Sequence, residues 1–126
     1  MNPHKGRTGL SRVLHATRYS WHGLSAAYRE EAAFRQEAWL AAAALPCALW
    51  LARSPLEAVL LMSAVLLVLI VELLNSGIEA AIDRISMDHH PLAKRAKDYG
   101  SAAVMLALLV CAALWAAVAW QRVAPT

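Results

Sequence analysis

The fold is decided by residues 58–84, which read AVLLMSAVLLVLIV followed by ELLNSGIEAAIDR. The first 14 of these residues carry no charge, and acidic groups begin where a membrane helix should still lie in lipid. Ionisable groups within a membrane are costly, and for that reason they usually mark functional sites. The stretch therefore predicts a membrane helix with a functional polar segment at one end.

One face of this acidic segment is polar. At about 100° per residue, five side chains fall within an arc of roughly 100°, and they are Glu72, Asn75, Ser76, Glu79 and Asp83. Their oxygens suit a hard cation, and a carboxylate that the cation leaves free can move a proton. Helix packing, or a basic residue of a partner helix, would also explain a polar face. Three acids on one face exceed what such packing needs, so we expect a functional site.

The composition places the chain among integral membrane proteins. Its 126 residues are 60% hydrophobic, which fits a single all-α membrane domain over residues 1–126. Segments without charge occur at residues 38–52, 58–71 and 99–121. Only the last reaches the ~20 residues that cross the hydrocarbon core, so the other two need their polar flanks. We expect transmembrane helices at residues 33–52, 56–84 and 97–121.

A different pattern occupies residues 10–30. Apolar side chains recur there at helical spacing, and basic side chains occupy other faces. Such a segment is too polar to span a membrane and is typical of an amphipathic helix at the membrane surface. We expect a surface helix on the cytoplasmic side.

The basic residues predict the orientation in the membrane. Ten of them lie before the first uncharged segment or between the second and third, and two lie on the other side. The ten are Lys5, Arg7, Arg12, Arg18, Arg29, Arg35, Arg84, Lys94, Arg95 and Lys97, and the two are Arg53 and Arg122. By the positive-inside rule, the N-terminus is cytoplasmic and the C-terminus lies outside. The net charge of +3 fits anionic lipid headgroups better than nucleic acid, which is not an expected partner.

Residues 86–98 are expected to form a cytoplasmic loop in which Pro91 breaks the helix. The basic groups of this loop can orient the protein or contact phosphate. The sequence has neither a Gly-rich phosphate loop nor a protein-kinase signature. Gly100 and the small residues after it would let the last span approach another helix closely. The residues alone thus indicate a three-helix membrane protein with a cation-binding acidic site facing the cytoplasm.

Three sequence motifs together resemble those of a known protein family. They read EAAFRQE at residues 31–37, VELLNSGIEAAIDR at residues 71–84 and RAKDYGSAAV at residues 95–104. With these motifs in this order, the chain resembles the small integral-membrane diacylglycerol kinases of bacteria from about Leu10 to Trp120. The resemblance implies a surface helix, three transmembrane helices and a homotrimer in the bacterial inner membrane, with the C-terminus periplasmic. It implies transfer of the γ-phosphoryl group of ATP to diacylglycerol, which yields phosphatidic acid.

The resemblance also implies roles for single residues. Glu72 would be the catalytic base, with Asn75 beside it, and Glu31 and Glu79 would hold Mg²⁺ against the nucleotide. Nucleotide-contacting positions are Arg12, Tyr19, Glu31, Glu79, Asp88, His89, His90, Lys97 and Asp98. Lipid-contacting positions are Arg12, Thr17, Arg18, Tyr19, Ser20, Trp21, Ser25, Ala26, Ala27, Tyr28, Ala33, Phe34, Arg35, Gln36, Glu37, Trp50, Leu51, Ala52, Arg53, Ala58, Glu72, Ser101 and Trp115. Departures from the best-known members at His22, Ser25, Tyr28 and His89 concern the lipid-headgroup and adenine contacts.

Three other functions compete with this interpretation. A family relative that phosphorylates undecaprenol would use the same metal and nucleotide chemistry, and the core motifs do not separate the two substrates. The EAAFRQE turn and the lipid-contacting positions favour diacylglycerol. A small proton-coupled exporter subunit also carries a membrane Glu, but it would want a fourth span and has no need of a phosphate-facing basic loop. A non-catalytic assembly subunit would not consume ATP.

Overall fold

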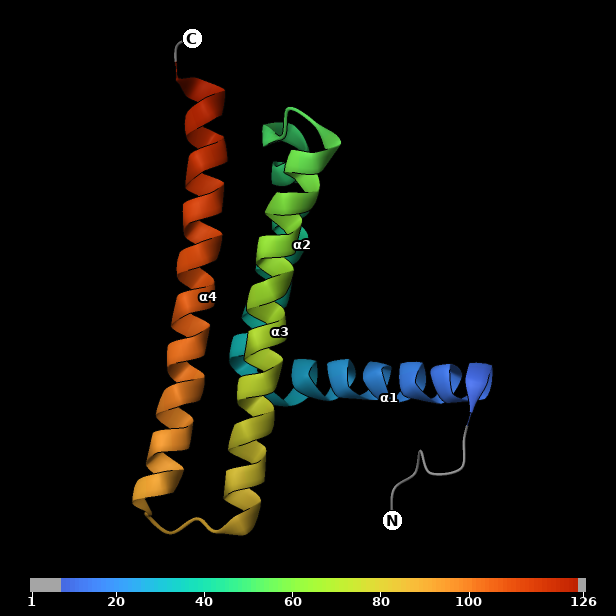
Figure 1. Cartoon of the computed structure of the whole chain (residues 1–126), viewed down its shortest axis with the longest axis vertical. Coiled ribbons are helices and arrows are strands. Elements are labelled where there is room, and N and C mark those ends of the chain that lie inside the picture. The colour runs from blue at the N-terminus through green and yellow to red at the C-terminus, as the bar shows by residue number, and fades with distance from the viewer. Residues whose placement is uncertain (1–7, 125–126) are drawn as a thin grey trace.

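The computed structural model describes residues 8–124, which form four helices. These are α1 (Gly9–Glu30), α2 (Ala32–Leu51), α3 (Pro55–Ile85) and α4 (Pro91–Val123). Figure 1 shows α2, α3 and α4 running alongside one another, while α1 lies crosswise and points away from them. The contacts place α3 between α2 and α4. The prediction of an all-helical chain is confirmed.

Two of the described helices, α3 and α4, are long and apolar enough to cross a membrane by length and composition. They have 31 and 33 residues, or about 46 and 50 Å of helix, against a hydrocarbon core of roughly 30 Å. The shorter α2 has 20 residues and carries Arg35 and Glu37 near its start. A third span at α2 therefore stays a prediction.

Proline and a capping side chain begin both of the long helices. At α3, Ser54 Oγ accepts a hydrogen bond from the Glu57 N–H at 3.2 Å, and Pro55 occupies the first turn. At α4, His90 Nδ1 accepts one from the Leu92 N–H at 3.1 Å, and Pro91 occupies the first turn. A first-turn proline loses no helical hydrogen bond and its backbone angle already suits a helix.

The expected loop over residues 86–98 is wrong in length. The non-helical segment covers residues 86–90 only. The helix α4 begins at Pro91, six residues before the predicted start at 97. Pro91 begins a helix here because His90 caps it, whereas proline breaks a helix only in its interior. The basic groups of residues 94–97 therefore stand on a helix rather than on a loop.

The core lies at the end of the bundle where α2 turns into α3. Ala48, Leu61 and Val118 are buried there, one from each of α2, α3 and α4. Trp115 packs against them, and its indole N–H donates to the Leu61 carbonyl at 3.0 Å. Elsewhere the three helices leave many large apolar side chains exposed. Apolar faces of this kind suit lipid or neighbouring helices.

Candidate active site

A tight corner between α1 and α2 places the first candidate acid, Glu31. Its backbone is extended, with φ −113° and ψ 107°, and its N–H donates to the Ala27 carbonyl at 2.9 Å. Arg35 then reaches back from α2. One of its guanidinium nitrogens donates to the carbonyls of Tyr28 and Arg29 at 2.8 and 3.3 Å. A cation on the last carbonyls of a helix is favourable, so Arg35 stabilises the corner that holds Glu31.

Glu72 lies in α3 at the centre of an acidic cluster. It is 8% exposed, and it is the only charged side chain that is buried among residues 8–124. Glu31 from the corner and Glu79 from α3 both lie close enough to act electrostatically on Glu72. Glu37 on α2 interacts with Glu72 in the same way. Side chains from three parts of the chain thus bring four carboxylates to one region.

This acidic cluster can supply only some of the ligands that a metal ion needs. Within the described chain, no group of three or more His, Cys, Asp or Glu side chains has the geometry to hold a metal ion. Magnesium commonly takes one or two protein carboxylates and completes its shell with substrate phosphates and water. The oxygens of Glu31 and Glu79 are donors of the right kind for that arrangement, which would need a nucleotide to complete it.

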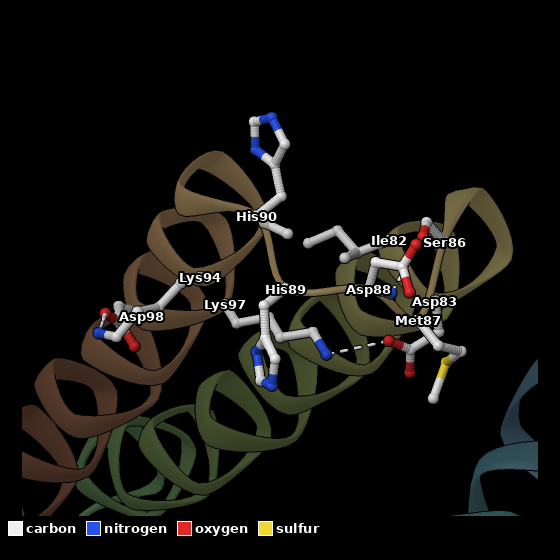
Figure 2. A pocket seen from close by; sticks show the side chains of 11 residues that line it. Ile82, Asp83, Ser86, Met87, Asp88, His89, His90, Lys94, Lys97 and Asp98 are labelled. Carbon is white, nitrogen blue, oxygen red and sulfur yellow. Dashed lines mark hydrogen bonds and ion pairs between the residues drawn. The ribbon is translucent and has the colours of Figure 1, made fainter.

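A second site lies where α3 and α4 meet the short loop between them (Figure 2). A hollow of about 290 Å³ is lined there by five of the expected nucleotide contacts, which are Asp88, His89, His90, Lys97 and Asp98. Lys97 Nζ donates to Asp83 Oδ1 at 2.9 Å and so joins α4 to α3 across this hollow. Lys94 Nζ donates to Asp98 Oδ2 at 2.7 Å along α4. We call this the charged pocket.

An apolar groove passes between α2, α3 and α4. It has a volume of about 230 Å³ and carries Glu37 as its one charged lining residue. Its lining is Glu37, Leu40, Ala44, Val65, Val68, Leu108, Cys111, Ala112 and Trp115. Glu37 Oε2 is buried and has no hydrogen-bond partner in the described chain. The groove thus offers apolar walls with one unpaired polar oxygen, on a side chain that interacts with Glu72.

Comparison with known proteins assigns this arrangement to a family. The model of the prokaryotic diacylglycerol kinases matches residues 18–119. The chain belongs to the prokaryotic diacylglycerol kinase family. It is therefore an enzyme, a lipid kinase.

Individual relatives of this family match nearly the whole chain. The protein named Diacylglycerol kinase from Pseudomonas aeruginosa PAO1 is 52% identical over 117 residues, which cover 93% of this chain and 95% of the relative. The one from Escherichia coli K12 is 50% identical over 115 residues, covering 91% and 94%. The one from Helicobacter pylori 26695 is 43% identical over 107 residues, covering 85% and 84%.

Several residues expected to contact lipid in this family member gather around α1. Ser20, Ala26 and Ala27 line a hollow of about 690 Å³ between α1 and α3, together with Glu31 and Ser76. A second hollow, of about 400 Å³, lies where α1 meets α2, and it is lined by Trp21, Leu24, Ser25, Tyr28, Arg29 and Phe34. Both hollows border the helix that the sequence predicts to rest on the membrane, and Leu24 lines each of them.

Other expected contacts lie apart from the acidic cluster. Trp50, Leu51, Ala52, Arg53 and Ala58 stand at the opposite end of the bundle, and Ala58 is about 21 Å along α3 from Glu72 at 1.5 Å per residue. There Arg122 lies over the Trp50 ring at 4.8 Å, and Arg53 donates to the Gln121 carbonyl. The remaining expected contacts are exposed in the single chain, namely Arg12, Thr17, Arg18, Tyr19, Ala33, Gln36 and Ser101.

The structure adds residues to the charged pocket that the sequence did not assign to a nucleotide. Asp83 and Lys94 line it, and Asp83 holds Lys97. A signal was present for Asp83, because it lies one turn beyond Glu79 on the predicted polar face. Nothing in the order of residues gives its pairing with Lys97, which stands 14 positions later on another helix.

Proposed function

We propose that the protein transfers the γ-phosphoryl group of ATP to the primary hydroxyl of diacylglycerol, yielding phosphatidic acid and ADP. The observation that carries this proposal is the position of buried Glu72. Its carboxylate lies in an acidic cluster, with a charged pocket further along α3 and α4 and an apolar groove that begins at Glu37. The relatives that bear the name Diacylglycerol kinase support the choice of lipid.

Glu72 acts as the general base in this proposal. As the lipid oxygen attacks the γ-phosphorus, its proton passes to the Glu72 carboxylate, the new O–P bond forms and the bond to the β-phosphate oxygen breaks. Phosphoryl transfer asks little covalent chemistry of a protein and depends on positioning and on charge neutralisation. Burial of Glu72 also keeps water, a competing acceptor, away from the reacting groups.

Glu31 and Glu79 would hold Mg²⁺ against the phosphates. When bound, the ion supplies positive charge that offsets the charge of the triphosphate. The protein's own part is to keep two carboxylates available near Glu72, one from the α1–α2 corner and one from two turns further along α3.

The charged pocket is the proposed place of the nucleotide. Lys97 is half-exposed there and can donate to a phosphate oxygen, and the other lining residues expected to contact nucleotide surround it. An ammonium group is a point charge that recognises phosphate without a fixed geometry. The acyl chains of the lipid fit the apolar groove, in which Glu37 marks the end nearer the reacting hydroxyl.

A homotrimer in the bacterial inner membrane completes the proposal, with the acidic cluster facing the cytoplasm. In one chain, Arg12 and Tyr19 stay on α1 and do not line the charged pocket, so a neighbouring chain's nucleotide is their proposed partner. Mixing Glu72→Gln chains with Glu31→Gln chains tests such sharing. Recovered activity in the mixed oligomer supports a shared site, and no recovery with both variants folded counts against it.

The function is tested by following labelled γ-phosphate. Purified protein in mixed micelles receives labelled ATP, Mg²⁺ and either diacylglycerol or undecaprenol. We expect label in phosphatidic acid. Label in undecaprenyl phosphate alone would keep the mechanism and overturn the substrate, and label in neither lipid would overturn the proposed function.

A further inference from the structure

Asn75 of α3 and Gly100 of α4 lie in close contact. Gly100 is buried in α4. A Cβ atom added to it would lie 2.1 Å from Asn75 Oδ1, 3.2 Å from Asn75 Cγ and 3.8 Å from Asn75 Cβ. Contacts below 3.0 Å do not occur for real Cβ atoms, whereas a Cβ added at Gly23 or Gly77 would meet nothing within 4 Å. Gly100 therefore provides the space that the Asn75 amide occupies.

Asn75 stands between the two acids on which the proposed chemistry depends. It follows Glu72 by three residues and precedes Glu79 by four, and these spacings make side chains neighbours on a helix surface. Its Oδ1 is buried and without a hydrogen-bond partner in the part of the chain that the structure describes. A buried polar group left unpaired is costly, so the amide stays there because packing holds it. The packing partner is the bare backbone of Gly100.

We propose that Gly100 is a positioning residue for phosphoryl transfer: it leaves the space in which the Asn75 amide lies beside Glu72 and Glu79. This rests on the proposed function, in which those two carboxylates are the base and a metal ligand. A side chain at position 100 would meet the oxygen and the amide carbon of Asn75 together. The Asn75 amide would have to shift or turn to relieve the contact with its oxygen, and either change takes the amide out of the position it occupies here.

The size of the displacement sets the expected effect. Raising the contact from 2.1 Å to the shortest tolerated distance of 3.0 Å requires Asn75 Oδ1 to move by at least 0.9 Å. A misplacement of about 1 Å at a reacting centre can lower a rate by roughly a hundredfold. We therefore expect Gly100→Ala to lower kcat by about this factor, while KM for ATP and KM for diacylglycerol stay within about twofold.

The kinetics of Gly100→Ala are compared with a control on the same helix. Ala102→Val adds bulk to α4 at an exposed position two residues away, on the face turned away from Gly100. Its kcat should equal that of the wild-type protein. Thermal unfolding in micelles gives the folded fraction of each variant, and rates are expressed per folded protein. If Gly100 had only a structural role, Gly100→Ala would lower stability without lowering kcat relative to KM. A wild-type kcat per folded Gly100→Ala protein would overturn the proposal.

A second comparison removes the neighbour instead. Asn75→Ala vacates the space beside Gly100, so adding Gly100→Ala to it should neither lower the residual rate further nor lower the unfolding temperature. The comparison of Asn75→Ala with the double variant tests the proposal even if the single Gly100→Ala variant fails to fold. If Gly100→Ala carries the same penalty in both backgrounds, Gly100 acts independently of Asn75 and the proposal is overturned. Failure of the proposed function would be detected separately, because the wild-type protein would then form no phosphatidic acid. That result would also overturn the positioning role of Gly100.

Discussion

Replacing Asp83 by asparagine tests how the charged pocket receives a nucleotide. The Asp83 carboxylate accepts from Lys97 Nζ at 2.9 Å, so a phosphate that binds Lys97 has to displace it. Asparagine keeps the shape of the side chain and removes its charge. The variant should therefore leave Lys97 free for phosphate, and it also removes a repulsion between carboxylate and phosphate. We expect Asp83→Asn to bind nucleotide more tightly than the wild-type protein.

The exposure of the ion pair gives the magnitude. The side chains of Lys97 and Asp83 are 42% and 44% exposed, and an exposed ion pair contributes about 0.2–1 kcal/mol. Since about 1.4 kcal/mol corresponds to a tenfold change in affinity, displacing the pair weakens nucleotide binding by roughly 1.4- to 5-fold. The Kd of Mg·ADP should fall by the same factor in Asp83→Asn.

Calorimetric titration of the protein in micelles with Mg·ADP measures this Kd without turnover. Glu57→Gln is the matched control, because it also removes one negative charge from α3 but near the other end of the helix. Its Kd should not change, while Lys97→Met should weaken binding. A Kd for Asp83→Asn equal to or higher than that of the wild-type protein would refute the reasoning.

Three further predictions concern stability, the corner and the metal. Leu61 is fully buried in the core, so Leu61→Ala should lower the free energy of unfolding in micelles by about 2–5 kcal/mol; a loss below about 1 kcal/mol would contradict the described packing. Arg35→Gln removes the guanidinium that holds the end of α1, so it should raise the Mg²⁺ concentration for half-maximal rate. A rise in KM for diacylglycerol with no change in that Mg²⁺ concentration would contradict the role at the corner and leave only the lipid contact that the resemblance implies. Removing divalent metal with a chelator should abolish transfer and added Mg²⁺ should restore it, whereas a rate that persists in chelator would exclude Glu31 as a ligand of an essential ion.

The sequence predicts those features of a helix that depend only on the residues of that helix. The uncharged run before Glu72 and the polar face after it follow from composition and spacing, and α3 has that form. The sequence pattern predicts the start of α4 six residues too late, because it indicates a helix break at Pro91, whereas His90 caps a new helix there. Whether a proline ends one helix or begins another therefore depends on whether the side chain before it can cap a helix.

The contacts between helices could not be predicted in the same way. The close approach of Gly100 to Asn75 and the pairing of Lys97 with Asp83 depend on how far α4 is shifted along α3. That shift is fixed by packing and by the length of the loop between the helices. The α1–α2 corner also depends on a bond from Arg35 back to carbonyls six and seven residues earlier, which the side-chain pattern does not reveal.

The most direct test of the account is a single-turnover measurement of phosphoryl transfer by Glu72→Gln, with Glu57→Gln beside it. General-base catalysis contributes roughly 10²- to 10⁴-fold to a rate. We predict that Glu72→Gln loses at least about a hundredfold in the transfer rate while binding Mg·ADP as the wild-type protein does, and that Glu57→Gln retains the wild-type rate. Transfer by folded Glu72→Gln at the wild-type rate would contradict the assignment of Glu72 as the base.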